Sequence, residues 1–136
     1  MTARRIDQGM AAAAAGILPD TVDDRLRTRY RQLPAMVRTA GLAATYAYLL
    51  SKQGDKTLGS AYRSVTTGIR EHLSRPGGVL TGVTTDLDVV GALARLPASG
   101  YARASVEAEM LAGWLSRLAE AKFQADVQPS TPDGNT

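Results

Sequence analysis

Apolar side chains recur at intervals of three and four residues along most of the chain, which is the spacing of one face of an α-helix. Residues 58–74 show this most clearly, because at about 100° per residue the apolar and polar side chains separate onto opposite sides. The polar side carries Arg63 and Arg70, about 10.5 Å apart along the helix axis, with hydroxyl side chains around them. That side suits phosphate contacts, and it equally suits plain solvent. The apolar side consists of Leu58, Tyr62, Val65, Ile69 and Leu73.

The same spacing predicts further helices over residues 2–18, 20–32, 42–52, 86–96 and 101–124. Pro34 lacks a backbone N–H, so it either kinks a helix or begins a new one, and we favour a new helix that ends at Gly41. We therefore expect an all-α fold, a compact bundle of five to six helices formed by residues 1–126 as a single domain. Residues 127–136 contain two prolines and one glycine and have the composition of a disordered tail.

The amino-acid composition favours helices and excludes the kinds of site that need cysteine. Of the 136 residues 44% are apolar and only 5% are aromatic, and alanine is abundant, which favours close-packed helices over a β-sandwich. The absence of cysteine excludes a disulfide scaffold, a thiolate zinc site, an iron–sulfur site and a thiol nucleophile, and it indicates a reducing compartment. The apolar stretch from Met10 to Leu18 is too short to span a bilayer. We expect a cytoplasmic protein with no membrane partner.

Charge is distributed unevenly along the chain. The net charge is only +3, but residues 25–75 carry ten basic and two acidic side chains, which makes this central block +8 and the remainder −5. Thirteen of the sixteen basic residues are arginine, whose planar guanidinium suits phosphate groups. Arg25, Arg27, Arg29 and Arg31 alternate along one predicted helix, so they spread over both of its flanks. The block indicates an anionic partner, or a solvated face.

No constellation of catalytic residues emerges from the sequence. His72 is the single histidine and lies at the edge of an apolar helix face, where we expect its neighbours to satisfy it. Asp86 and Asp88 resemble a metal-binding pair, but Asp86 precedes a predicted helix, a position at which acidic side chains cap free N–H groups. Gly77-Gly78 is not followed by Lys-Ser/Thr, so there is no P-loop. We expect no enzyme, no catalytic residue, no metal site and no cofactor.

The aromatic residues do not indicate a base-reading surface. Tyr46, Tyr48, Tyr62 and Trp114 lie at helical spacings that favour core or interface positions. They do not form the stacking platform with which RNA-recognition sheets bind bases. We therefore expect that this chain does not read nucleotide sequence.

Two stretches in a fixed order resemble a known family. The first reads YRQLPAMVRTAGL from Tyr30 to Leu42 and continues to YLLSK at Lys52, and the second reads YARASVE from Tyr101 and WLSRLAEA from Trp114. Together they are similar to the small subunit of the type III-B, or Cmr-type, CRISPR RNA-guided effector complex. The chain departs from the family pattern in the second stretch. Arg117 follows a serine where a Lys-Arg pair is usual, and we expect it to pair with Glu120 or Glu107.

The resemblance implies a non-catalytic structural subunit in antiviral defence. Several copies of such a subunit stack along the complex, so its partners are other subunits of the complex, copies of itself, and guide and target RNA. Base pairing between guide and target supplies sequence specificity, so a scaffold beside them needs only contacts to the phosphate backbone. The RNA-facing residues that we expect are Arg38 and Lys52, from matched motif positions, and Arg63 and Arg70, from the helical wheel.

Two other classes of protein fit the sequence less well. In a small helical DNA-binding regulator, residues 34–52 would form a helix-turn-helix around Gly41. The would-be recognition helix, residues 42–50, is too apolar to face a DNA groove. A small hydrolase would need a nucleophile beside its base, and the chain offers no such pair.

Overall fold

The structure is a computed structural model that describes residues 2–127, with side chains described from Asp7 onward. In this range the chain forms six α-helices and one short 3-10 helix, which confirms the predicted all-α fold. The elements are α1 (Thr2–Ile17), α2 (Asp24–Ala40), α3 (Leu42–Ser51), α4 (Thr57–Leu73), η1 (Asp86–Asp88), α5 (Val89–Ala94) and α6 (Ala98–Val127). Within the described range no helix has both the length and the apolar character needed to cross a membrane. The predicted tail lies outside the described residues except for Val127, which ends α6.

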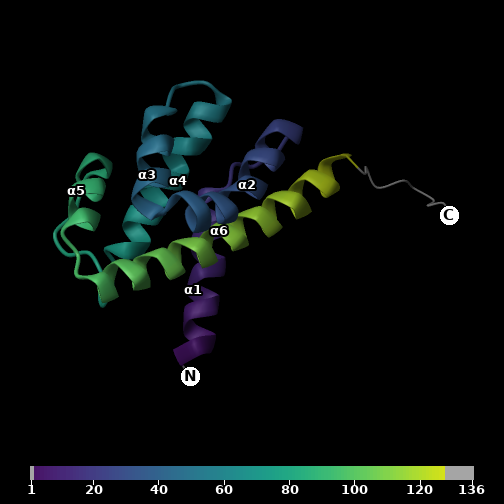
Figure 1. The fold of residues 1–136 in the computed structure, drawn as a ribbon. Coiled ribbons are helices and arrows are strands. Elements are labelled where there is room, and N and C mark those ends of the chain that lie inside the picture. The colour runs from purple at the N-terminus through teal and green to yellow at the C-terminus, as the bar shows by residue number, and fades with distance from the viewer. Residues whose placement is uncertain (1, 128–136) are drawn as a thin grey trace.

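The longest helix, α6, is the element around which the others are arranged (Figure 1). In Figure 1 it runs diagonally across the molecule, with α1 extending below it and α3 and α4 above it. Ala104, Ala108 and Ala119 are buried along its inner side, and their small side chains allow neighbouring helices to approach closely. Leu111 and Leu115 are fully buried and fill the core beside them. The buried side of α6 therefore packs against both α1 and α2 and joins them to the rest of the fold.

The prediction that Pro34 begins a new helix is wrong. One continuous helix, α2, runs from Asp24 to Ala40 with Pro34 inside it. Leu26, Leu33 and Val37 are buried on the same face before and after the proline, and α2 packs along α6 more extensively than any other pair of helices. This tertiary packing outweighs the local cost of a proline in a helix interior.

The boundary between α2 and α3 falls at Gly41, as predicted. Gly41 has φ +98°, a conformation that residues with a Cβ rarely adopt, and its N–H donates to the Val37 carbonyl at 3.1 Å. The first turn of α3 is held by α6, because the Ala43 N–H donates to the Tyr101 hydroxyl at 3.0 Å. The chain can therefore change direction sharply while one of the N–H groups left free at the start of α3 finds a partner on α6.

The predicted helix over residues 58–74 is confirmed as α4. Val65, Ile69 and Leu73 are buried on its apolar side, as the wheel predicts. Gly68 faces α1, where a Cβ would overlap the side chain of Ile17, so this glycine sets the closest approach of the two helices. The Tyr46 hydroxyl of α3 donates to the Thr66 carbonyl of α4 at 2.8 Å and fixes α3 against the same helix.

Candidate nucleic-acid interface

The four predicted RNA-facing residues lie on different parts of the fold, and the structure does not gather them into one site. Arg38, near the end of α2, donates to Glu109 of α6 at 2.6 Å. Lys52, just after α3, places its Nζ 5.6 Å from the centre of the Tyr48 ring. On α4, Arg63 lies 4.0 Å from the fully exposed Asp55, whereas Arg70 pairs with Asp86 at 2.6 Å.

These pairings differ in how much of each cation they leave for another partner. The Arg70 side chain is 19% exposed, so it is largely covered, whereas Arg63 and Arg38 are 49% and 58% exposed. A surface ion pair such as the one between Arg63 and Asp55 contributes little and exchanges easily with another anion. Lys52 is exposed and has no acidic partner among the described residues. By geometry, Lys52 and Arg63 are the most available of the four, and Arg70 is the least.

Asp86 does not cap a helix as the sequence suggested. Its carboxylate accepts from Arg70 and lies 3.1 Å from the hydroxyls of Thr66 and Thr67 on α4, and no side chain caps η1. The competing partner is a cation sixteen residues earlier in the chain, which a local helix-start rule cannot detect. Burial, together with the nearby Asp86 carboxylate, raises the pKa of Tyr46 behind this cluster.

The four alternating arginines of α2 divide between its two flanks, as the sequence predicts. On the flank beside α6, Arg27 and Arg31 share Glu120 at 3.5 and 3.4 Å, and Arg27 also stacks on the Phe123 ring at 3.9 Å. On the flank beside α4, Arg25 and Arg29 have no acidic partner among the described residues. The four alternating arginines of α2 are therefore neutralised on one flank only.

The unpaired flank of α2 meets two tyrosines. The rings of Tyr48 and Tyr62 pack edge to face with centroids 6.3 Å apart. Burial and Tyr48 raise the pKa of Tyr62, while the positive charges of Arg29 and Arg25 oppose that shift. Arg29 and Tyr62 also line the same small hollow between α2 and α4. We call Arg25, Arg29 and Lys52, together with Tyr48 and Tyr62, the tyrosine patch.

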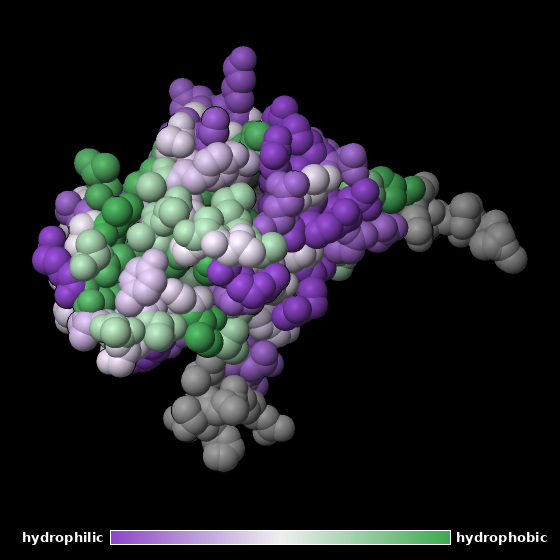
Figure 2. All heavy atoms as spheres, in the orientation of Figure 1, coloured by the Kyte–Doolittle hydropathy of each residue, from purple (hydrophilic) through white to green (hydrophobic). Residues whose placement is uncertain are grey.

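The tyrosine patch lies where α2 begins and α3 gives way to α4. Figure 2 shows hydrophilic side chains gathered along this edge, over the start of α2 and the α3–α4 turn in Figure 1. Sequence reasoning missed Arg25 and Arg29 as site residues. Their alternation with Arg27 and Arg31 showed that they differ in flank, but only the position of Glu120 on α6 shows which flank stays positive.

His72 is satisfied by its neighbours, as expected, in a cluster that ties α4 to α6. Its Nε2 lies 3.1 Å from Glu107, which also accepts from Arg75 at 3.0 Å and Arg103 at 2.9 Å. Burial and the nearby Arg75 lower the pKa of His72, with Glu107 opposing them. Burial alone would raise the pKa of Glu107, but hydrogen bonds from Arg75 and Arg103 outweigh it and lower that pKa. This cluster is a structural tie.

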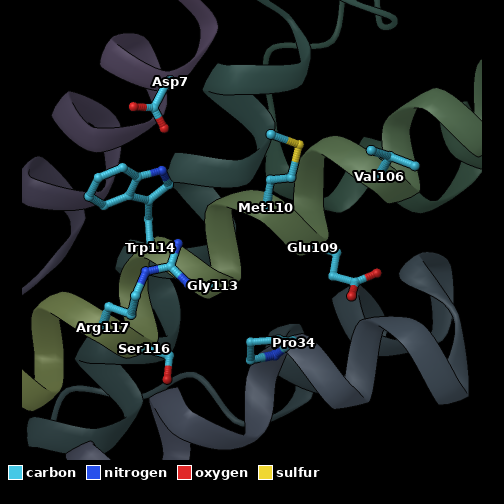
Figure 3. Close-up of a pocket in the computed structure, with 9 residues that line it drawn as sticks. All are labelled: Asp7, Pro34, Val106, Glu109, Met110, Gly113, Trp114, Ser116 and Arg117. Carbon is cyan, nitrogen blue, oxygen red and sulfur yellow. The ribbon is translucent and has the colours of Figure 1, made fainter. Parts of the chain in front are cut away.

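The outer side of α6 carries a shallow concavity of about 580 Å³ that α1 and α2 help to line. Figure 3 shows Met110 and Trp114 extending from the same side of α6. Val106 and Met110 are among the most exposed large apolar residues described. The expectation that Arg117 pairs with Glu120 or Glu107 is wrong, because arginines of other elements occupy both glutamates, and Arg117 instead lies 5.4 Å from the centre of the Trp114 ring.

The surface of the described chain offers exposed cations that suit phosphate groups, and exposed apolar side chains on α6. Among the described residues, no group of three or more His, Cys, Asp or Glu side chains is placed to hold a metal ion. Residues 42–50, the recognition helix of a DNA-binding regulator, bury Leu42, Tyr46 and Leu49 in the core. These side chains are therefore unable to face a DNA groove.

Comparison with known proteins agrees with the two sequence stretches described above. Residues 4–122 match the family model described as CRISPR-associated protein (Cas_Cmr5), which covers nearly the whole described chain and both stretches. No curated protein and no solved structure gives a significant match. The chain therefore belongs to the Cas_Cmr5 family of CRISPR-associated proteins.

Proposed function

We propose that this chain is a non-catalytic structural subunit of a type III-B CRISPR RNA-guided effector complex, stacked in several copies in the cytoplasm. In this role it binds the backbone of guide and target RNA through basic side chains and leaves sequence recognition to base pairing. Family membership supports a place among CRISPR effector subunits. The one-sided neutralisation of α2 supports the RNA contact.

The tyrosine patch carries the proposed contact. Arg25, Arg29 and Lys52 are exposed and without acidic partners among the described residues, so binding phosphates breaks no ion pair. Releasing counterions from an RNA backbone is favourable wherever such free cations line it. Lys52 belongs both to this patch and to the motif from which we predicted RNA contact.

The other predicted RNA-facing residues extend the proposed surface along the fold. Arg63 directly follows Tyr62 on α4 and has only a long contact to Asp55. Arg38 lies at the far end of α2 and is exposed despite its bond to Glu109. Arg70 faces Asp86 and would need to exchange that partner before it bound phosphate.

A charge reversal in the assembled complex tests the proposal. Arg29→Glu should weaken retention of target RNA by roughly tenfold at moderate salt, because it removes a free cation and adds a repelling charge. The matched control is Arg95→Glu, which makes the same change at an exposed arginine of the α5 end that has no acidic partner among the described residues. Equal RNA retention by the two variants, at equal incorporation of the subunit, would contradict the RNA contact.

The apolar stripe of α6 supports the proposed assembly with neighbouring subunits. We define the α6 stripe as Val106, Met110 and Trp114, with Arg117 over the tryptophan ring. Tryptophan, methionine and arginine are enriched in the centres of protein interfaces. Exposed apolar side chains that share one concavity are typical of surfaces covered in a complex.

A further inference from the structure

The carboxylate of Asp86 lies among three hydrogen-bond donors of α4. Arg70 donates through Nε to Oδ1 at 2.6 Å, and the hydroxyls of Thr66 and Thr67 each lie 3.1 Å from Oδ2. Thr66 is fully buried, and the Gln53 side-chain amide donates to its hydroxyl at 2.7 Å. Thr66 is thus fixed by the core behind it, and all three donors converge on one anionic group.

This set of donors suits a phosphate as well as a carboxylate. A guanidinium and two hydroxyls bind adjacent anionic oxygens, which both groups present. Thr66 has a second acceptor, the Arg63 carbonyl at 3.0 Å, so its proton is not stranded when Asp86 leaves. A phosphodiester could therefore replace the carboxylate without leaving a buried donor unsatisfied.

The segment that carries Asp86 is buried at its two ends and largely exposed between them. Leu80 and Val89 are buried, and the Leu80 N–H donates to the Leu73 carbonyl at 3.0 Å. Between these anchors Gly82 has φ +71°, and Leu87, directly after Asp86, is 80% exposed. Residues 81–88 are held by the contacts of Asp86 to α4, by the partly buried Val83 side chain against the core, and by a long hydrogen bond of 3.5 Å from Ser74 to the Val83 carbonyl.

We propose that Thr66, Thr67 and Arg70 form a phosphodiester-binding site that Asp86 closes in the free subunit. An RNA backbone that lies along the polar side of α4 displaces the carboxylate, and residues 81–88 move away between their anchors. The inference rests on the proposed RNA contact and adds to it a binding site that is covered by Asp86 until RNA is present. It also gives Arg70 a route to RNA although its side chain is only 19% exposed and already paired.

Two isosteric substitutions in the same turn test this closed site in the full-length chain. Asp86→Asn removes the competing charge, whereas Asp88→Asn removes an equal charge from a side chain that bonds only to Thr85. Fluorescence anisotropy with a fluorescein-labelled single-stranded RNA should show binding at least threefold tighter for Asp86→Asn and unchanged for Asp88→Asn. The dependence of log K on log salt should steepen by about 0.7, as expected for one added phosphate contact.

A second substitution tests whether the gain in RNA affinity depends on Arg70. Arg70→Gln placed in the Asp86→Asn background should return the affinity to that of the wild type, because the new contact needs the guanidinium. Equal affinities of Asp86→Asn and Asp88→Asn, or a gain that survives Arg70→Gln, would overturn the closed site. If wild-type RNA binding is present but insensitive to Asp86→Asn, the closed site is wrong while the contact through Arg29 stands. Failure of all variants to bind RNA would overturn both.

Hydrogen exchange keeps the test decisive if Asp86→Asn fails to fold. In the wild-type protein, RNA should accelerate amide exchange in residues 81–88 and leave the anchors at Leu80 and Val89 protected. Unchanged exchange in residues 81–88 at saturating RNA would overturn the proposed displacement.

Discussion

Single carboxylates decide which cations of this protein are free. Glu120 forms ion pairs with two arginines of α2, and Glu107 accepts from Arg75 and Arg103 while it also contacts His72. Arg29 has no acidic partner among the described residues, whereas Arg27, two residues earlier, pairs with the Glu120 carboxylate at 3.5 Å. Whether an arginine is available to bind an anion therefore depends on the absence of a nearby carboxylate as much as on its own charge.

The free energy of unfolding should decrease as the pH is lowered from about 7.5 to about 5.5, because of the titration of His72. Burial and the charge of Arg75 lower its pKa in the folded state, against Glu107, so below its ordinary value of 6.5 the unfolded chain binds a proton that the folded chain does not. The Arg103 charge acts in the same direction as that of Arg75. The midpoint of urea unfolding should therefore be lower at the acidic end of this range.

His72→Gln should flatten that pH dependence. The chain has a single histidine, and the lowered pKa of Glu107 places its own loss of stability at more acid pH, below its ordinary value of 4.5. The glutamine amide can still donate to Glu107, so the variant should fold. An unfolding midpoint that falls equally in the wild type and His72→Gln would show that another group titrates.

Helix positions follow from local spacing, but helix pairings do not. The periodicity predicts the apolar side of α4, and Gly41 marks the break between α2 and α3, because both depend on residues within a few positions. The effect of Pro34 is not predicted from the sequence because α6, against which the continuous helix α2 packs, lies far along the chain. Likewise, Arg31 and Glu120 are 89 residues apart, so the sequence shows the arginine flanks but not which one is neutralised.

Gly68→Ala should destabilise the packing of α1 on α4. A Cβ at Gly68 would overlap the Ile17 side chain, so the helices must separate or Ile17 must leave its place, at a cost of about 1–3 kcal/mol in the free energy of unfolding. The measurement is urea unfolding of the two variants beside the wild type. Gly9→Ala is the matched control, because that helical position has no atom within 4 Å of the added Cβ.

Helix propensity gives the control the opposite sign. Gly9→Ala should raise the free energy of unfolding by about 0.5–1 kcal/mol, since alanine loses less backbone entropy than glycine in a helix. If Gly68→Ala were also stabilising, the close approach of α1 and α4 at Ile17 would be wrong.

For the molecule as a whole, the acidic flanks of the sequence fold back onto the basic centre. Glu107, Glu109 and Glu120 all lie on α6 and each binds an arginine from the +8 block. Arg25 and Arg29 on the other flank of α2, and Lys52 after α3, have no acidic partner among the described residues. A modest net charge of +3 therefore leaves the cations Arg25, Arg29 and Lys52 without acidic partners among the described residues, and none of them lines the concavity that holds the apolar α6 stripe.

Disrupting the α6 stripe should prevent assembly without unfolding the subunit. Met110 and Val106 are 44% and 57% exposed, so Met110→Lys and Val106→Lys should leave the free chain folded while placing a charge where a neighbouring subunit excludes water. Co-purification with the other effector subunits should fall severalfold for each variant, with thermal unfolding of the free subunit within a few degrees of the wild type. Leu87→Lys makes the same change at an even more exposed apolar residue outside the stripe. If all three variants assembled equally well, the α6 stripe would be a solvent-facing surface; if all three failed equally, the added charge rather than its position would be responsible.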